Sequence, residues 1–171
     1  MNDSYRVAVI GSDEDNLSDI EKERLYPLCI SLGKKLADNN CVVFTGGDRG
    51  IGLKVLQGVC ENGGMTVVFF PGQENTLPMD VVKIPIYTGV GYGIRDILML
   101  RTVDAVVSLA GGAGTLNELA NAYHLYKPII TLKNSGGWTE RLEDTYIDSK
   151  KRRKLFHVIR LMNCYKLYYM K

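Results

Sequence analysis

Five residues within eight positions carry the strongest chemical signal in this sequence. They are Gly111, Gly112, Gly114, Thr115 and Glu118. Glycine has no Cβ, so the backbone at these positions can adopt positive φ and a ligand can approach the main chain closely. Glu118 adds a carboxylate, which could activate water or stabilise positive charge that develops on a bound ligand. The group therefore combines close backbone contact with a reactive side chain.

The elements around these residues predict an anion pocket. Ala105–Leu109 is short, apolar and rich in β-branched residues, which is typical of a strand buried on both faces. A helix is expected to begin at Thr115, with one face formed by Leu116, Leu119, Ala120 and Tyr123. The unpaired N–H groups of a helix start and the positive end of its dipole point to one spot. Phosphate is the expected ligand at this helix start.

Glu118 has two interpretations from the residues alone. In the first, it complements the helix dipole or forms a capping box with Thr115 as the cap. In the second, it turns toward the ligand. A carboxylate repels a neighbouring phosphate, so the second interpretation requires a nearby cation, and Arg95 is the candidate. Arg95 lies near an expected helix start, where a cation opposes the dipole, and this misfit favours a ligand role.

Residues 95–118 resemble the Lonely Guy family of cytokinin-activating nucleoside 5'-monophosphate phosphoribohydrolases, long mislabelled as lysine decarboxylases. That family carries an Arg before a Met, then an Asp-Ala strand, then the motif P-G-G-x-G-T-x-x-E. The matching residues are Arg95, Met99, Asp104, Ala105, Gly111, Gly112, Gly114, Thr115 and Glu118. Ala110 replaces the Pro of the motif, and Tyr92-Gly93-Ile94-Arg95 replaces Met-His-x-Arg. With these departures, the chain more closely resembles a less characterised branch of the same superfamily. That superfamily also includes molybdenum-cofactor carrier proteins and the nucleotide-sensing SLOG domains.

The resemblance implies an activity, and it leaves an alternative open. It implies that Arg95 and Glu118 are catalytic in hydrolysing the N-glycosidic bond of a nucleoside 5'-monophosphate to base and ribose 5-phosphate. No cofactor is expected, and the protein is not expected to be a pyridoxal-phosphate lysine decarboxylase. The alternative is a non-catalytic carrier of a nucleotide or of the molybdenum cofactor, a pterin, or a nucleotide sensor. The resemblance also implies a homodimer or a larger homo-oligomer.

Two further loops are expected to border the same site. Gly11 and Ser12 follow the apolar strand Arg6–Ile10, and Gly46 and Gly47 follow the strand Cys41–Thr45. Each loop opens at the carboxyl end of a strand, where open α/β sheets bind ligands. The resemblance assigns Gly46 and Gly47 to the sugar and phosphate, whereas a tight turn with nothing bound is the plain alternative. The spacing is not G-x-G-x-x-G, which disfavours a dehydrogenase.

The remaining pattern predicts an α/β fold with a single Rossmann-like, doubly wound domain over residues 1–149. Five or six apolar strands alternate with helices, which indicates a mainly parallel sheet covered on both faces. The two glycine loops are expected side by side at its carboxyl edge. Further strands are expected at residues 66–70, 81–86 and 129–132 and a short helix at residues 139–143, and Pro27 is expected in a first helical turn.

Composition limits the remaining possibilities. The chain has 46% hydrophobic and 23% charged residues and no apolar run of the roughly 20 residues that a membrane span needs, so a cytoplasmic protein without membrane contact is expected. Its four cysteines show no Cys-x-x-Cys spacing, so we expect reduced thiols and no metal. Residues 150–171 form a basic C-terminal segment with eight of the 21 Lys and Arg residues and no acid. The remainder is acidic, which makes nucleic acid an unexpected partner.

Overall fold

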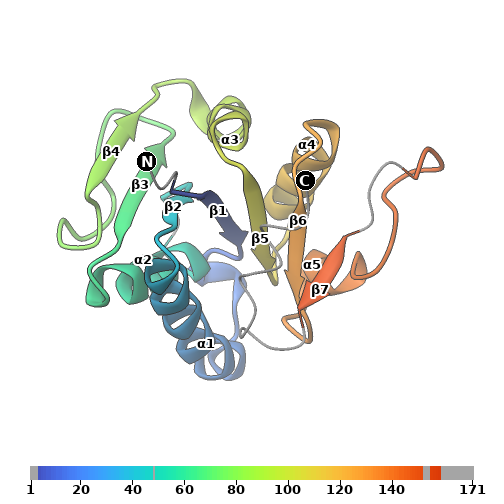
Figure 1. Cartoon of the computed structure of the whole chain (residues 1–171), viewed down its shortest axis with the longest axis horizontal. Helices are drawn as coiled ribbons and strands as arrows, with labels where there is room; N and C mark the ends of the chain where they lie inside the picture. Colours follow the sequence, from blue (N-terminus) through green and yellow to red (C-terminus); the bar gives the residue numbers. More distant parts are fainter. Residues whose placement is uncertain (1–3, 48, 152–154, 159–171) are drawn as a thin grey trace.

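The computed structural model describes residues 4–47, 49–151 and 155–158, which form one seven-stranded parallel sheet with helices on both faces (Figure 1). The strand order is β4-β3-β2-β1-β5-β6-β7. The strands are β1 Arg6–Gly11, β2 Val42–Thr45, β3 Met65–Phe70, β4 Ile84–Tyr87, β5 Ala105–Leu109, β6 Ile129–Leu132 and β7 Phe156–Val158. The helices are α1 Asp19–Asp38, α2 Ile51–Glu61, α3 Gly91–Thr102, α4 Ala113–His124 and α5 Gly137–Arg141, with a 3-10 turn at Glu14–Asn16.

The direction of winding reverses between β1 and β5. From β1 the chain builds outward through β2, β3 and β4, and it then returns to the other side of β1 to add β5, β6 and β7. In Figure 1, α1 and α2 lie below the strands and α3 and α4 lie above them. This arrangement confirms the doubly wound Rossmann-like fold, with strand pairs that are all parallel rather than only mainly so. Its switch point is at the ends of β1 and β5.

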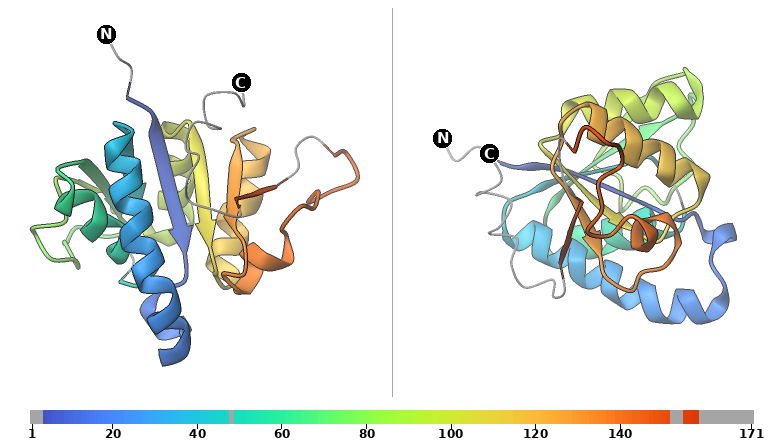
Figure 2. Two further views of the ribbon diagram at one scale, coloured as in Figure 1. Left: turned by 60° about the horizontal axis from the view of Figure 1, so that its bottom comes forward. Right: turned by 90° about the vertical axis from the view of Figure 1, so that its right-hand side faces the viewer.

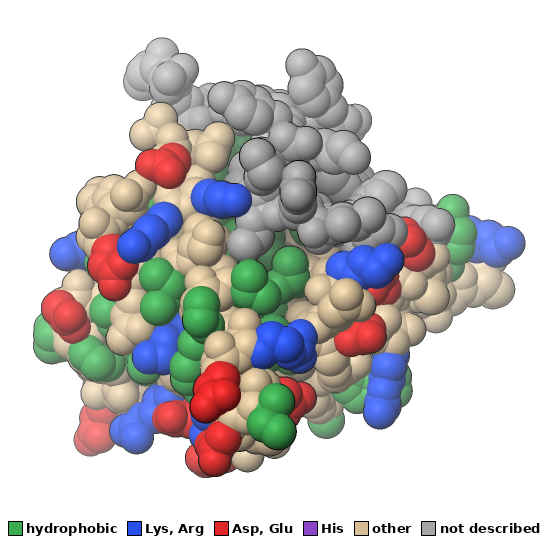
Figure 3. All heavy atoms as spheres, turned by 90° about the horizontal axis from the view of Figure 1, so that it is seen from below, with side chains coloured by type: hydrophobic (Ala, Val, Ile, Leu, Met, Phe, Trp, Pro, Cys, Tyr) green, Lys and Arg blue, Asp and Glu red, His purple; other side chains and the backbone are tan. Residues whose placement is uncertain are grey.

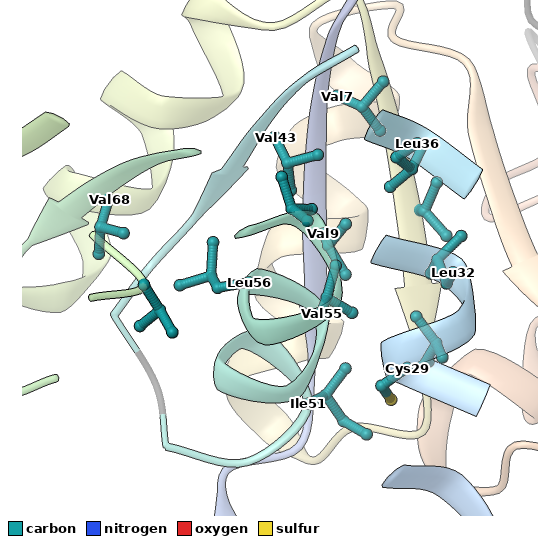
Figure 4. Close-up of a cluster of buried hydrophobic side chains, with 14 of the residues drawn as sticks. Val7, Val9, Cys29, Leu32, Leu36, Val43, Ile51, Val55, Leu56 and Val68 are labelled. Atoms are coloured by element: carbon teal, nitrogen blue, oxygen red, sulfur yellow. The ribbon is translucent and has the colours of Figure 1, made fainter. Parts of the chain in front are cut away.

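Alternating side chains of β1 divide the core into two layers. Val7 and Val9 belong to the apolar cluster under α1 and α2, whereas Ala8 and Ile10 belong to the cluster under α3 and α4. Successive strand residues point to opposite faces, so a strand between two helical layers must be apolar throughout. Figure 4 shows the first cluster, in which Val7, Val9 and residues of α1 and α2 meet. The continuous apolar runs of the sequence therefore follow from burial on both faces.

Helix α1 begins earlier than expected, and the predicted place of Pro27 in a first turn is wrong. Ser18 is the N-cap, and its hydroxyl accepts a hydrogen bond from the Glu21 N–H at 3.4 Å. The Glu21 carboxylate accepts one from the Ser18 N–H at 2.9 Å, and these bonds lower the pKa of Glu21. This capping box starts the helix eight residues before Pro27. Pro27 is exposed, so water can reach the carbonyl that the proline leaves without a helical donor.

Two other boundaries differ from the sequence expectation. The fourth strand covers Ile84–Tyr87, and Val81 and Val82 instead lie in a buried turn before it. The Thr66 hydroxyl holds that turn, since it donates to the Val81 carbonyl at 2.8 Å and accepts from the Lys83 N–H at 3.0 Å. The short helix is Gly137–Arg141 rather than residues 139–143. Within the basic segment 150–171, β7 pairs with β6 at the edge of the sheet.

Both views in Figure 2 show α1 running alongside the sheet, and Figure 3 shows the molecule from below. On the described part of that face, acidic and basic side chains are interspersed among apolar ones. This mixture of charge is typical of the surface of a globular protein. No helix in the described ranges is both long and apolar enough to cross a membrane.

An ion pair joins Arg6, the first residue of β1, to Asp104, the residue just before β5, at the edge opposite the switch point. The Arg6 guanidinium donates two hydrogen bonds to the Asp104 carboxylate, at 2.7 and 3.1 Å, and the Arg6 N–H donates a third at 2.9 Å. These bonds lower the pKa of Asp104. Both side chains are partly exposed, at 51% and 31%, so solvent screens the pair.

We expect Arg6→Gln to lower the free energy of unfolding at pH 7 by about 1 kcal/mol or less. Because folding depresses the pKa of Asp104, its contribution is present above the ordinary carboxyl pKa of about 4 and is lost as the pH falls below the folded value. The difference from wild type should therefore disappear near pH 2 in urea titrations. Lys34→Gln, which removes the more exposed Lys34–Glu61 pair, is the control. A pH-independent difference would contradict the prediction.

Candidate functional site

The turn between β5 and α4 is held by hydrogen bonds from three other segments. The Gly111 N–H donates to the Ser12 hydroxyl after β1 at 2.9 Å, and the Ala110 N–H donates to the Ser135 hydroxyl after β6 at 2.9 Å. In the other direction, the Ala110 carbonyl accepts from Thr139 at 3.1 Å and the Gly111 carbonyl accepts from Trp138 at 2.9 Å. Every backbone polar group of Ala110 and Gly111 is therefore paired, which fixes the position of the turn.

The start of α4 differs from the sequence expectation. The helix begins at Ala113 with Gly112 as its N-cap, and no side chain caps it. Thr115 is the third helical residue, and its hydroxyl donates to the Gly11 carbonyl at 3.1 Å. The predicted capping box with Thr115 as the cap is therefore wrong, because the hydroxyl is directed to β1 instead. The buried face of α4 also differs from the expected one, since it consists of Thr115, Glu118, Leu119, Ala122 and Tyr123.

The three glycines of this turn have different structural roles. Gly111 has φ of 100°, and a Cβ there would meet the Thr115 side chain, so only glycine fits. Gly112 and Gly114 are exposed and have φ outside the left-handed region, and a Cβ on either would meet no atom within 4 Å. Folding therefore does not require glycine at these two positions. What their glycines provide is open access to the N–H groups of the first turn of α4.

A cavity of about 380 Å³ lies in front of this helix start, and we call it the α4 cavity. It is lined by Gly11, Ser12, Asp13, Asn16, Tyr92, Arg95, Asp96, Gly112, Ala113, Gly114, Thr115 and Glu118. The cavity thus brings together seven of the ten site residues predicted from the sequence, and Glu118 is buried against it at 7% exposure. Gly111 lies buried behind the lining.

Gly46 and Gly47 line a second cavity of about 610 Å³, which we call the β2 cavity. The glycine loops after β2 and β5 are both at the carboxyl edge of the sheet, as expected, with the end of β1 between them. The two cavities share Asp13 and Tyr92. The site therefore has two adjoining parts rather than a single pocket.

The Arg95 guanidinium is directed into the protein. Its Nη1 donates to the Gly46 carbonyl and, at 3.1 Å, to the Phe69 carbonyl. Its Nε lies 3.0 Å from the Asp96 carboxylate, and its Cζ lies 5.5 Å from the centre of the Tyr92 ring. The side chain is only 3% exposed. Arg95 therefore joins α3 to the ends of β2 and β3.

Besides Ala113 in the predicted glycine turn, sequence reasoning missed four residues that line the α4 cavity, namely Asp13, Asn16, Tyr92 and Asp96. Asp96 carried the one available signal, because an acid next to a base in an otherwise apolar helix segment suggests a buried pair. The other three lie in loops or at a helix start, where no periodic pattern marks a functional position. In the described ranges, no group of three His, Cys, Asp or Glu residues is placed to hold a metal ion.

The cysteines of the described ranges, Cys29, Cys41 and Cys60, form no disulfide, and Cys164 lies outside those ranges. Burial raises the pKa of the Cys29 thiol to about 12. A thiol with that pKa remains protonated and unreactive at neutral pH. The cysteine nearest the core is therefore a packing residue.

The fold and the site together define a Rossmann-like protein with an open helix start at the switch point of its sheet. The chain belongs to the SLOG cluster4 family, which it matches over residues 4–167. This confirms the superfamily expected from residues 95–118 and places the chain in its SLOG branch.

Two similar proteins of known structure share this fold over most of their length, and a third protein is similar in sequence. The structural-genomics target TM1055 is 31% identical, with a TM-score of 0.87 over 98% of this chain and 99% of that one. A molybdenum cofactor carrier protein from Chlamydomonas reinhardtii is 30% identical, with a TM-score of 0.67 over 76% of this chain and 77% of that one. An uncharacterized protein of Archaeoglobus fulgidus is 29% identical over 75% of this chain and 80% of its own length.

The backbone at Ala110 generates a prediction about the family motif. Ala110 has φ of 54°, and its N–H donates to Ser135, whereas proline fixes φ near −65° and has no N–H. We expect Ala110→Pro to lower the free energy of unfolding by about 3 kcal/mol or more. Ala110→Gly should stay within about 1 kcal/mol of wild type, because glycine accepts positive φ. Urea unfolding measures both, and a stable Ala110→Pro variant would show that this turn has another conformation.

Proposed function

We propose that the protein binds a nucleoside 5'-monophosphate or a comparable phosphorylated small molecule in the α4 cavity. The phosphate lies at the start of α4, where the N–H groups of residues 112–115 and the helix dipole favour an anion. Three observations support this placement: the helix start has no side-chain cap, Gly112 and Gly114 leave it open, and the cavity lies in front of it. Gly11 and Ser12 border the same space from β1.

We further propose that Glu118 hydrolyses the N-glycosidic bond of the bound nucleotide. The observation that carries this step is the burial of Glu118 in the same cavity as the open helix start. Breaking the bond develops positive charge on the sugar, so a carboxylate beside the anomeric carbon stabilises the transition state and can activate water. Anchoring the phosphate fixes the position of the sugar, so that binding energy from a remote group contributes to orientation.

Arg95 acts indirectly in this proposal. Its guanidinium donates hydrogen bonds to the Gly46 and Phe69 carbonyls and forms an ion pair with Asp96, so the phosphate relies on backbone N–H groups rather than on this cation. Arg95 instead holds the loop after β2 and the start of α3 in place around the ligand.

A second candidate function is a non-catalytic carrier of a phosphorylated cofactor. It is favoured by the 30% identity to the molybdenum cofactor carrier protein of Chlamydomonas reinhardtii and by Ala110, whose positive φ excludes the proline of the hydrolase motif. A carrier needs the same phosphate site but no reaction at the sugar. Turnover therefore separates the two candidates.

The discriminating experiment follows base release from a panel of nucleoside monophosphates by chromatography. Glu118→Gln keeps the shape of the side chain and removes its charge, so we expect release to fall by about 10²- to 10⁴-fold while phosphate-dependent binding persists. Binding measured by calorimetry on the same samples is the control. Binding without release by the wild-type protein, or release that Glu118→Gln does not reduce, would favour the carrier.

The exposed glycine of α4 provides a separate test of the phosphate site. Replacing a helical glycine by alanine in open space stabilises a helix by roughly 0.5–1 kcal/mol, so Gly114→Ala should raise the melting temperature. The same methyl group stands where the ligand must approach the backbone, so the variant should bind ribose 5-phosphate more weakly. Gly93→Ala in α3, another open helical position, should stabilise without weakening binding. Equal affinity of Gly114→Ala and wild type for ribose 5-phosphate would contradict the placement of the phosphate at this helix start.

A further inference from the structure

The β2 cavity adjoins the proposed phosphate site but is not part of it. Its volume of about 610 Å³ exceeds the 380 Å³ of the α4 cavity, and both cavities are lined by Asp13 and Tyr92. Arg95 lines the α4 cavity, and its Nη1 is bonded to the carbonyl of Gly46, which lines the β2 cavity. The two cavities therefore adjoin at Asp13 and Tyr92, where a ligand bound in both would pass.

Tyr92 stands at the junction as a flat apolar surface. Its ring is in cation–π distance of the buried Arg95 guanidinium, at 5.5 Å, while the residue is 68% exposed. The guanidinium thus supports the ring from within the protein, and most of the tyrosine remains available for contact. Planar heterocycles stack on exposed aromatic side chains of this kind, and each such contact contributes substantially to affinity.

Charge in the β2 cavity indicates which kind of ring fits. Its described lining contains four carboxylates against a single guanidinium, from Asp13, Glu14, Asp15, Glu74 and Arg49. Ionised carboxylates only accept hydrogen bonds, so they favour a ring edge that presents N–H donors. The same excess of negative charge repels a second phosphate group. The cavity is therefore suited to a donor-rich ring on a monophosphate.

We propose that the β2 cavity binds the ring of the phosphorylated ligand, stacked on Tyr92 with a 2-amino-4-oxopyrimidine edge facing the carboxylates. Guanine and pterins share this edge, which presents a ring N–H and an amino group side by side. The proposal rests on the proposed phosphate site at α4 and specifies its substrate class. It assigns the recognition of the ring to α3, to the loop after β1 and to the loop after β3.

The test compares ligands that differ in one group. Calorimetry with the full-length protein measures ribose 5-phosphate, GMP, IMP, AMP and a pterin monophosphate. IMP lacks only the 2-amino group of GMP, so we expect GMP to bind about tenfold or more tightly than IMP, and AMP to resemble IMP. GMP and the pterin should both exceed ribose 5-phosphate, and comparing these two identifies which ring the site prefers.

Variants separate the ring from the phosphate. Tyr92→Ala should weaken GMP binding by roughly tenfold to a hundredfold and leave ribose 5-phosphate unchanged, whereas Tyr92→Phe should retain GMP affinity. Glu74→Gln should reduce the preference for GMP over IMP. Tyr146→Ala, which removes another exposed tyrosine outside both cavities, is the control.

The outcomes distinguish the two proposals. If ribose 5-phosphate binds but GMP is no tighter, if IMP or AMP equals GMP, or if Tyr92→Ala leaves GMP affinity unchanged, the ring assignment is overturned and the phosphate site stands. If neither ribose 5-phosphate nor any of the monophosphates binds to the folded protein, the proposed function fails, and the ring assignment fails with it.

Discussion

The site depends on the turn of two residues that ends β5. Ala110 and Gly111 both have positive φ, and all four of their backbone polar groups are bonded to residues after β1 and around α5. Since buried backbone groups are costly to leave unpaired, this network permits one position of the turn. The position of this turn also fixes the direction of α4, and thereby the positions of Glu118 and of the open N–H groups.

A second constraint is the burial of Arg95 with Asp96. Burying an ion pair carries a desolvation cost that the pair itself offsets only in part. Here the guanidinium also donates hydrogen bonds to two backbone carbonyls near the ends of β2 and β3, those of Gly46 and Phe69. A Cβ at Gly46 would collide with the guanidinium, so a side chain there would have to displace the end of Arg95 from its buried position. Glycine at position 46 therefore fits the contact that Arg95 makes.

The glycines of the site therefore follow two different physical rules. At Gly111 the positive φ and the Thr115 side chain leave no room for a side chain, and at Gly46 a side chain would displace the buried Arg95 guanidinium. Gly114 is a glycine in open space within α4, where folding would tolerate or prefer alanine, whereas Gly112 is the N-cap, a position that suits glycine. A residue that costs helix stability and serves no packing purpose is most simply explained by what approaches it from solvent. This contrast supports the proposed phosphate site at the start of α4.

The sequence by itself determined the first six strands, with only the start of β4 misplaced, together with the parallel sheet and the glycine turn after β5, because burial on both faces imposes continuous apolar runs that are readable locally. It did not predict β7 at the edge of the sheet. The sequence also contains Ser18 and Glu21, the capping box that starts α1, but the position of Pro27 led to a helix start predicted too late. Only the tertiary structure decided the direction of the Arg95 guanidinium and the partner of the Thr115 hydroxyl, which lies 104 residues away at Gly11. Such side chains choose among donors and acceptors on several strands, and their choice depends on which strand ends the winding of the sheet brings together.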